Sequence, residues 1–380
     1  RGCIDAQKSH MLYGIGNGSK NKVIVTFHEQ KAKELYDDYR FFEPNTVYYP
    51  AKDILFYQSD IRGNLLTAER IRALRAIHEQ QEVTVITTFD ALMNTMAPPK
   101  TLWDSIRRIE PGDTVVLDEL VARLVQMGYE KEYQVDTVGQ FALRGGILDV
   151  YPLTEDNPVR IEMWGDEVDT IRSFDVESQK SIENLEELVI YPACELVLDD
   201  EEKQAGIARF LKEAKTFASK LKKEMKTEEA HRALSTAQEL AEEWGELSVT
   251  AGMDAYLSYF SEERVGLLDY FDPADTYLFF DELSRCTERG KQTEVEFAES
   301  MKQRLEKGYI LPGQMKELFG FKEVMGKIER YSCIAVSALD VKTNGLKSNG
   351  QYGIHVKSVN AYNNSFELLI KDLQHYKKNG

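Results

Sequence analysis

Short runs rich in β-branched residues alternate with helix-length amphipathic segments in the N-terminal part of the chain. The runs at residues 22–27, 46–49 and 83–87 predict buried strands. Between them, apolar residues recur at helical spacing over residues 29–39 and 67–80. Strands that alternate with helices of this length pair in parallel, because the helix carries the chain back to the starting edge of the sheet. We therefore expect an α/β domain built on a parallel sheet.

The pattern changes near residues 111–112. Residues 133–191 are rich in β-branched and aromatic residues, with turn signals at residues 139, 145–146, 157–158 and 165–166. This pattern predicts a smaller, mostly antiparallel β-rich domain. Helical periodicity then resumes at residue 199 in two consecutive long segments. The first runs to about residue 226 and the second to about residue 244. Six lysines mark the first segment, but glutamates dilute them, so we interpret this face as solvated.

The composition limits the classes of function. A formal charge of −17, from 47 basic and 64 acidic residues, repels a phosphate backbone, so protein partners are favoured over general DNA binding. Cys3, Cys194, Cys286 and Cys333 form no C-x-x-C pair, and the six histidines form no metal-binding motif. We also find no apolar run long enough to span a bilayer and no signal peptide. We expect a globular protein of the reducing cytoplasm without a metal site.

The N-terminus nearly spells a phosphate-binding loop, whose pattern is Gly, four free positions, then Gly-Lys-Ser/Thr. Gly2, Lys8 and Ser9 are in register, but Gln7 replaces the second glycine. A side chain there obstructs the close approach of backbone N–H groups to a phosphate, and Asp5 adds a repelling charge. We predict a strand–turn–helix element that has lost its nucleotide, and expect the chain to be a fragment cut close to this motif. A nucleotide site that tolerates Gln7 is the alternative.

Two segments resemble the Walker B strand, which ends in Asp-Glu and positions Mg²⁺. The segment 115–119 continues into apolar residues at helical spacing, so Asp118 is expected near a helix start, as a cap. The segment 275–282 is a better strand and ends in Asp281 and Glu282. Without a phosphate cradle these acids have no Mg²⁺–phosphate to hold. We interpret Asp281 and Glu282, together with Gly2, Gln7, Lys8 and Ser9, as a non-functional nucleotide site.

Three stretches carry a specific resemblance: GQFALRGGILDVYP (139–152), PVRIEMWGDEV (158–168) and IRSFDVESQ (171–179). They resemble the N-terminal module of bacterial transcription-repair coupling factors (Mfd), which is similar to the damage-recognition protein UvrB. The resemblance is dense over 120–193 and looser but collinear over 2–103 and 254–307. It implies a degenerate RecA/helicase-like parallel-sheet domain, split into domains 1a and 1b, with a smaller β-rich α+β domain 2 inserted.

The implied boundaries are 1–106 for domain 1a, 107–195 for domain 2 and 196–380 for domain 1b with the start of a following segment. Residues 317–380, which contain a strand-like stretch at 331–336 and a helical end at 366–376, complete domain 1b or begin the next domain.

Two departures separate this chain from UvrB, which has an intact phosphate-binding loop and a long aromatic hairpin in domain 1a that threads DNA. Here the loop is broken, and residues 48–57 are too few for such a hairpin. We therefore expect Tyr48, Tyr49 and Tyr57 to be packing residues. Both losses are typical of the coupling factor, and a UvrB-like damage-recognition ATPase remains the alternative.

The resemblance implies a non-catalytic adaptor that recruits UvrA in transcription-coupled nucleotide-excision repair. It also implies restraint of the ATP-driven DNA translocase, through docking on a C-terminal domain of the full-length protein. The translocase, with its ATP and Mg²⁺, and the parts that bind RNA polymerase and duplex DNA lie in domains absent from this chain. No cofactor is expected here. The UvrA contacts of the family fall on Arg144, Arg160 and Trp164.

The residues themselves are compatible with such a surface. Arg144 precedes a Gly-Gly turn, and alternation along a strand places Arg160, Glu162 and Trp164 on one face. Arg and Trp are enriched among interface hot spots. The other reading leaves Trp164 in the core and pairs Arg160 with Glu162 or a cross-strand acid. Core positions are expected at residues 143, 147 and 150.

Overall fold

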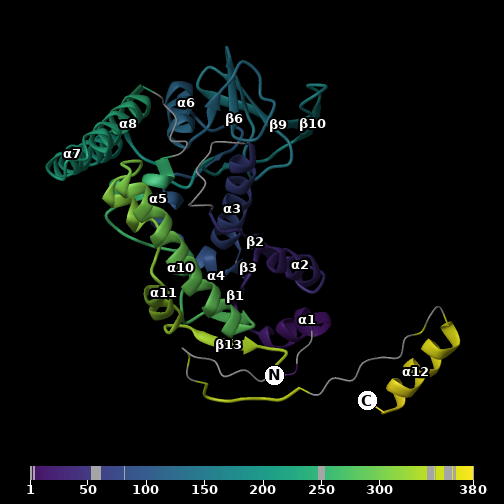
Figure 1. Cartoon of the computed structure of the whole chain (residues 1–380). Coiled ribbons are helices and arrows are strands. Elements are labelled where there is room, and N and C mark those ends of the chain that lie inside the picture. Colours follow the sequence, from purple (N-terminus) through teal and green to yellow (C-terminus); the bar gives the residue numbers. More distant parts are fainter. Residues whose placement is uncertain are drawn as a thin grey trace.

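The protein is described here from a computed structural model that covers the chain except residues 1, 3–4, 53–60, 81, 247–252, 340–345, 347, 355–361, 363–364 and 380. Within this part, the strands form a five-stranded sheet, a six-stranded sheet and a two-stranded ladder (Figure 1).

The five-stranded sheet, called the main sheet, is parallel throughout. Its spatial order is β13 (Ser332–Val336), β12 (Thr276–Asp281), β1 (Asn21–Thr26), β3 (Val83–Thr88) and β2 (Thr46–Tyr49). The α/β fold with a parallel sheet is therefore confirmed. The strand-like stretch at residues 331–336 joins this sheet as an edge strand, more than 240 residues after β2 and β3 in the chain.

Helices cover both faces of the main sheet because its strands are apolar on both sides. In β1, Val23 and Val25 pack into one cluster and Ile24 into the other. The first face carries α3 (Ile61–Glu79), α4 (Phe89–Leu92), α10 (Leu283–Glu306) and α11 (Phe321–Ile328). The second carries α1 (Asp5–Gly16) and α2 (Glu29–Tyr39).

The six-stranded sheet is the β-rich part of the molecule. Its order is β10 (Ser181–Asn184), β9 (Glu167–Phe174), β8 (Val159–Trp164), β7 (Ile147–Val150), β6 (Gln140–Arg144) and β5 (Glu130–Lys131). All pairs are antiparallel except β5–β6. The apolar face packs against α6 (Leu117–Gln126). Asp118 lies in the first turn of α6, but Val116 occupies the N-cap position, so the predicted cap was wrong.

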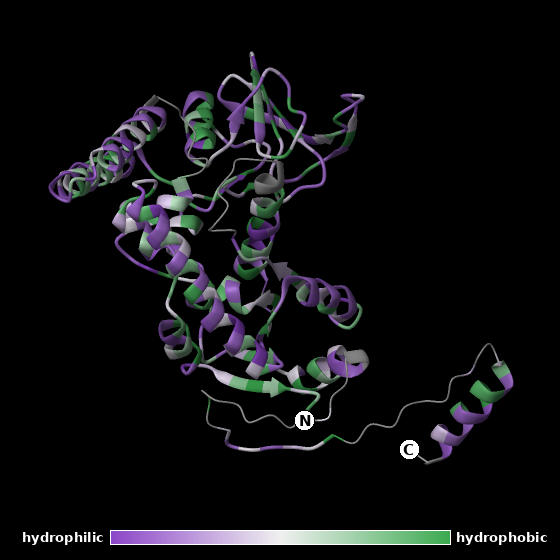
Figure 2. Cartoon of the chain, in the orientation of Figure 1, coloured by the Kyte–Doolittle hydropathy of each residue, from purple (hydrophilic) through white to green (hydrophobic). Residues whose placement is uncertain are grey.

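Short elements and a helical hairpin connect the two sheets. Strand β4 (Arg107–Ile109) pairs with β11 (Leu188–Ile190) where the chain enters and leaves the β-rich part. The hairpin of α7 (Asp200–Lys223) and α8 (Thr227–Glu246) is largely hydrophilic in Figure 2. Lysines 212, 215, 220, 222 and 223 of α7 are exposed, as a solvated face requires. The remaining short helices are α5 (Pro99–Trp103), η1 (Met253–Tyr256), α9 (Leu257–Phe260), η2 (Leu267–Tyr270) and η3 (Pro312–Lys316).

A buried charge cluster, the Glu195 cluster, lies where these segments meet. Glu195, just after β11, pairs with Arg70 of α3 and with Lys52, which follows β2, at 3.1 Å. Lys52 also pairs with Asp254 of η1 at 3.2 Å. The Arg70 guanidinium lies over the Tyr49 ring, 4.1 Å from its centroid. Four segments distant in the sequence are thus joined by charge as well as by apolar packing.

The last described helix, α12 (Phe366–Asn379), lies apart from both sheets in Figure 1. In the described part of the chain, no helix combines the length and the apolar character needed to cross a membrane.

Candidate partner-binding surface and candidate nucleotide site

Lys8 and Ser9, the two residues that fit the end of the phosphate-binding-loop pattern, lie at the carboxyl edge of the main sheet, where nucleotide sites of α/β proteins are found. Lys8 and Ser9 lie on α1, next to the end of β12. The Lys8 Nζ atom pairs with Asp281 Oδ1 at 2.6 Å and with Glu282 Oε1 at 3.1 Å. The lysine that would hold a phosphate therefore contacts the two acids that would position Mg²⁺.

This ion pair is buried. Lys8, Ser9 and Asp281 have almost no exposed surface, and the Thr26 hydroxyl approaches Asp281 Oδ2 at 3.5 Å. Burial raises the pKa of Asp281, and the charge of Lys8 only partly offsets this effect. Glu282 has a left-handed backbone, and its carboxylate accepts a hydrogen bond from the Ala338 backbone N–H at 2.8 Å.

The chain itself also covers the first glycine of the loop. Gly2 has φ +83°, and a Cβ added there would overlap the carbonyl oxygen of Ile354. Ile354 packs against the cluster of Leu12 and Ile24 on the same face of the sheet. Gln7 is half-buried, while the side chain of Asp5 lies outside the described part. Among the described residues, no group of three or more His, Cys, Asp or Glu side chains could hold a metal ion.

A second candidate site lies on the polar face of the β-rich sheet. Hairpin register places Asp149 of β7 opposite Ala142 of β6 and Arg160 of β8. Arg160 donates from Nε to Asp149 Oδ1 at 2.6 Å and from Nη2 to Oδ2 at 2.9 Å. Arg144 donates from Nη2 to the same Oδ2 atom. One carboxylate thus anchors two guanidinium groups from different strands.

Arg160 is held on further sides. Its Nη2 also donates to Gln179 Oε1 at 3.1 Å, and its guanidinium lies 4.4 Å from the centroid of the Phe174 ring. The hydrogen bonds that Arg160 donates to the Asp149 carboxylate raise the pKa of Arg160 above its ordinary value. The Arg160 side chain is only 14% exposed, against 39% for Arg144. Arg160 is therefore largely buried and pairs with a cross-strand acid, as the other reading of this residue held.

Trp164 is 82% exposed and lies at the end of β8, beside the turn that begins at Gly165. Strand alternation places Trp164 on the same face as Arg160 and Glu162. Across the sheet, Arg144 of β6 lies opposite Ile147 of β7, which lies opposite Glu162 of β8. Trp164 lies two residues further along β8 than Glu162. The tryptophan is therefore a surface residue and not a core residue.

The core prediction holds for two of its three residues. Leu143 and Val150 pack in the cluster beneath α6, but Ile147 does not. Ile147 pairs with Arg144 and Glu162 on the polar face and is half-exposed. A two-residue Gly145–Gly146 turn pairs residue 144 with 147 and 142 with 149, so this register already placed Ile147 and Asp149 on the face of Arg144.

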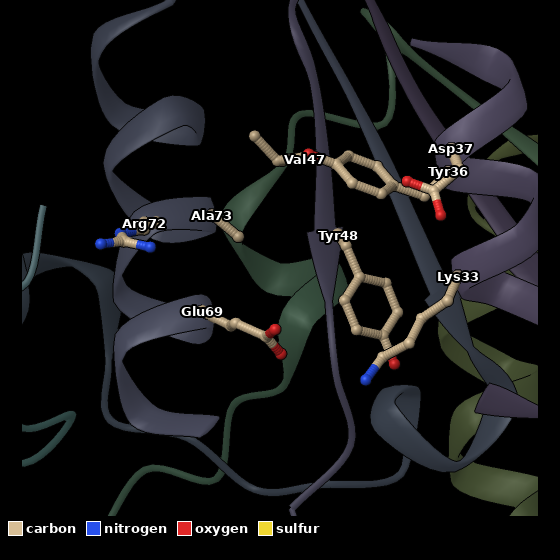
Figure 3. Close-up of a pocket in the computed structure, with 8 residues that line it drawn as sticks. All are labelled: Lys33, Tyr36, Asp37, Val47, Tyr48, Glu69, Arg72 and Ala73. Atoms are coloured by element: carbon tan, nitrogen blue, oxygen red, sulfur yellow. The ribbon is translucent and has the colours of Figure 1, made fainter. Parts of the chain in front are cut away.

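The tyrosines near β2 are packing residues. Tyr49 is fully buried, and its hydroxyl contacts the Met96 sulfur at 3.1 Å. Tyr48 is also buried and lines an open pocket of about 340 Å³ between α2 and α3, where its ring lies between Lys33 and Glu69 (Figure 3). Tyr57 lies outside the described residues.

Comparison with known proteins identifies the β-rich part. Residues 108–196 match the family described as "UvrB interaction domain". The chain is 33% identical over 310 residues to the transcription-repair-coupling factor of Bacillus subtilis. This alignment covers 81% of the chain and 26% of that protein. The factor of Staphylococcus haemolyticus is 28% identical over 375 residues, 95% of the chain and 30% of that protein.

UvrABC system protein B of Thermosipho africanus is 29% identical over 266 residues, 69% of the chain and 40% of that protein. The resemblance to the UvrB-like module of coupling factors is therefore confirmed, and the chain spans between a quarter and two-fifths of the length of these relatives.

Proposed function

We propose that this chain is the non-catalytic, UvrA-recruiting module of a transcription-repair coupling factor, with the domain division 1–106, 107–195 and 196–380. The observation that carries the proposal is the 82% exposure of Trp164 on the face of the β-rich sheet that also carries Arg144, within the segment that matches the UvrB interaction domain. An exposed indole and an exposed arginine on one face of a sheet have the composition of an interface hot spot. In this proposal Trp164 supplies the apolar contact, and Arg144 pairs with a carboxylate of UvrA.

The test is the affinity of the purified chain for UvrA. Trp164→Ala and Arg144→Ala should each weaken binding by roughly thirtyfold, as expected for hot-spot truncations of about 2 kcal/mol. Phe41 is also 82% exposed but lies outside the interaction domain, so Phe41→Ala is a matched control. Normal binding by both site variants, or equal loss with Phe41→Ala, would contradict the proposal.

We propose further that the chain neither binds nor hydrolyses ATP. The residues at the carboxyl edge of the main sheet do not fit a Mg²⁺–nucleotide complex. Lys8 pairs with both acids that would hold the metal, and Ile354 lies against the first glycine of the loop. Calorimetry with ATP and Mg²⁺ should detect no binding. Micromolar affinity that disappears on Lys8→Ala would favour the second candidate, a UvrB-like ATPase, which the UvrB relatives keep open.

The remaining activities belong, in this proposal, to other parts of a longer protein. These are ATP-driven DNA translocation, contact with RNA polymerase and duplex DNA, and the C-terminal domain that docks on this module to restrain the motor. Adding such a C-terminal domain in trans should compete with UvrA for the chain. If the C-terminal domain and UvrA bind the chain simultaneously and independently, the two do not use the same surface.

A further inference from the structure

Asp149 is a fully buried carboxylate at the centre of the candidate surface, and neither the motif nor the comparisons assign it a role. It has no exposed surface, and both of its oxygens accept hydrogen bonds from arginines. A carboxylate is removed from water in this way only where cations and hydrogen bonds compensate for its lost hydration. The burial of the Asp149 carboxylate therefore requires Arg144 and Arg160 at these positions.

The two arginines use Asp149 differently. Arg160 gives it two N–H groups in the bidentate geometry that fits a carboxylate, while also contacting Gln179 and the Phe174 ring. Arg144 reaches it through Nη2, and its side chain stays 39% exposed. Because a guanidinium has five N–H donors, Arg144 keeps donors that face solvent.

The distribution of charge also distinguishes Arg144 from Arg160. Two guanidinium groups around one carboxylate leave a net charge of about +1 at the surface. The neighbouring acid on this face, Glu162, is already paired with Arg172 and accepts from the Thr170 hydroxyl. The excess positive charge therefore resides on Arg144, the more exposed of the two arginines.

We propose that Asp149 is the positioning residue of the UvrA-binding surface. It fixes the Arg144 guanidinium so that the free donors meet a carboxylate of the partner, and Arg160 acts through Asp149 and not by touching the partner. This inference rests on the proposed function. Fixing one flexible side chain before binding is worth about 0.5–1.5 kcal/mol, so its loss should weaken binding about two- to tenfold.

The test measures UvrA affinity and the melting temperature of Asp149→Asn and of the double variant Asp149→Asn/Arg160→Gln. The double variant also removes the guanidinium that the first change leaves buried without its anion. Both should remain folded and bind about two- to tenfold more weakly. Glu162→Gln, which breaks a charge pair on the same face, is the matched control and should bind normally.

A double-mutant cycle distinguishes the positioning role of Asp149 from a purely structural role. In an Arg144→Ala background, Asp149→Asn should cause no further loss, since its effect passes through Arg144. Three results would each overturn the inference. The variant Asp149→Asn/Arg160→Gln could bind UvrA with unchanged affinity, or it could lose affinity only by unfolding. The third is that the losses of affinity from Asp149→Asn and Arg144→Ala are additive. If Trp164→Ala and Arg144→Ala also bind normally, it is the proposed function that fails.

Discussion

Glu195→Gln should destabilise the folded chain by about 3–5 kcal/mol, the usual cost of leaving buried cations without their anion. The substitution preserves shape but removes the charge that faces both Arg70 and Lys52. Arg70 retains the Pro50 carbonyl, to which Nη1 donates at 2.5 Å, and Lys52 retains Asp254. These contacts do not neutralise Arg70, which is 1% exposed, so its charge would remain buried and unbalanced.

The pKa of Glu195 gives an independent magnitude. Burial alone would raise this pKa, but the charges of Arg70 and Lys52 outweigh burial and lower it from 4.5 to about 2. At about 1.4 kcal/mol per pKa unit, that difference corresponds to about 3 kcal/mol. Because the folded-state pKa is the lower one, this stabilisation is complete above pH 4.5 and is lost as the pH falls from 4.5 through 2.

The assay is urea unfolding at pH 7 and at several values down to pH 3. With about 1–3 kcal/mol lost per molar urea, Glu195→Gln should lower the midpoint by roughly 1–2 M or more at pH 7. It should also flatten the fall in stability between pH 5 and pH 3. The exposed acid Glu177, changed to Gln, is the control. A midpoint equal to that of the unchanged chain would show that the Glu195 cluster contributes no net stability.

Four smaller predictions follow from the two candidate sites. Arg144→Lys should weaken UvrA binding because the ammonium lacks the planar fork, which titration of UvrA measures. Trp164→Ala should leave the melting temperature nearly unchanged, since the side chain is exposed. Gly2→Ala should lower the melting temperature, because φ is +83° and the Cβ would overlap Ile354. Gln7→Gly alone should not create ATPase activity in a phosphate-release assay, because Lys8 still pairs with Asp281.

The local sequence determined the fold class because it depends on short-range periodicity. Residues 29–39 repeat at helical spacing, and 83–87 form a short apolar run, which is sufficient to predict a parallel α/β sheet. The antiparallel β-rich part was recognisable from its turns for the same reason. The presence of Gln7 at the second glycine position of the loop pattern was equally local and readable without coordinates.

The tertiary structure alone decided which distant groups meet. Lys8 and Asp281 are separated by more than half of the chain, and no spacing rule predicts that they pair in the absence of a nucleotide. The burial of Arg160 was also undecided, because alternation along a strand gives a face but not what covers it. Covering by Phe174 and Gln179, and neutralisation by Asp149, depend on how β7, β8 and the turn at Gln179 come together. Periodicity acts between neighbours in sequence, whereas burial and charge pairing are properties of contacts that exist only in the folded chain.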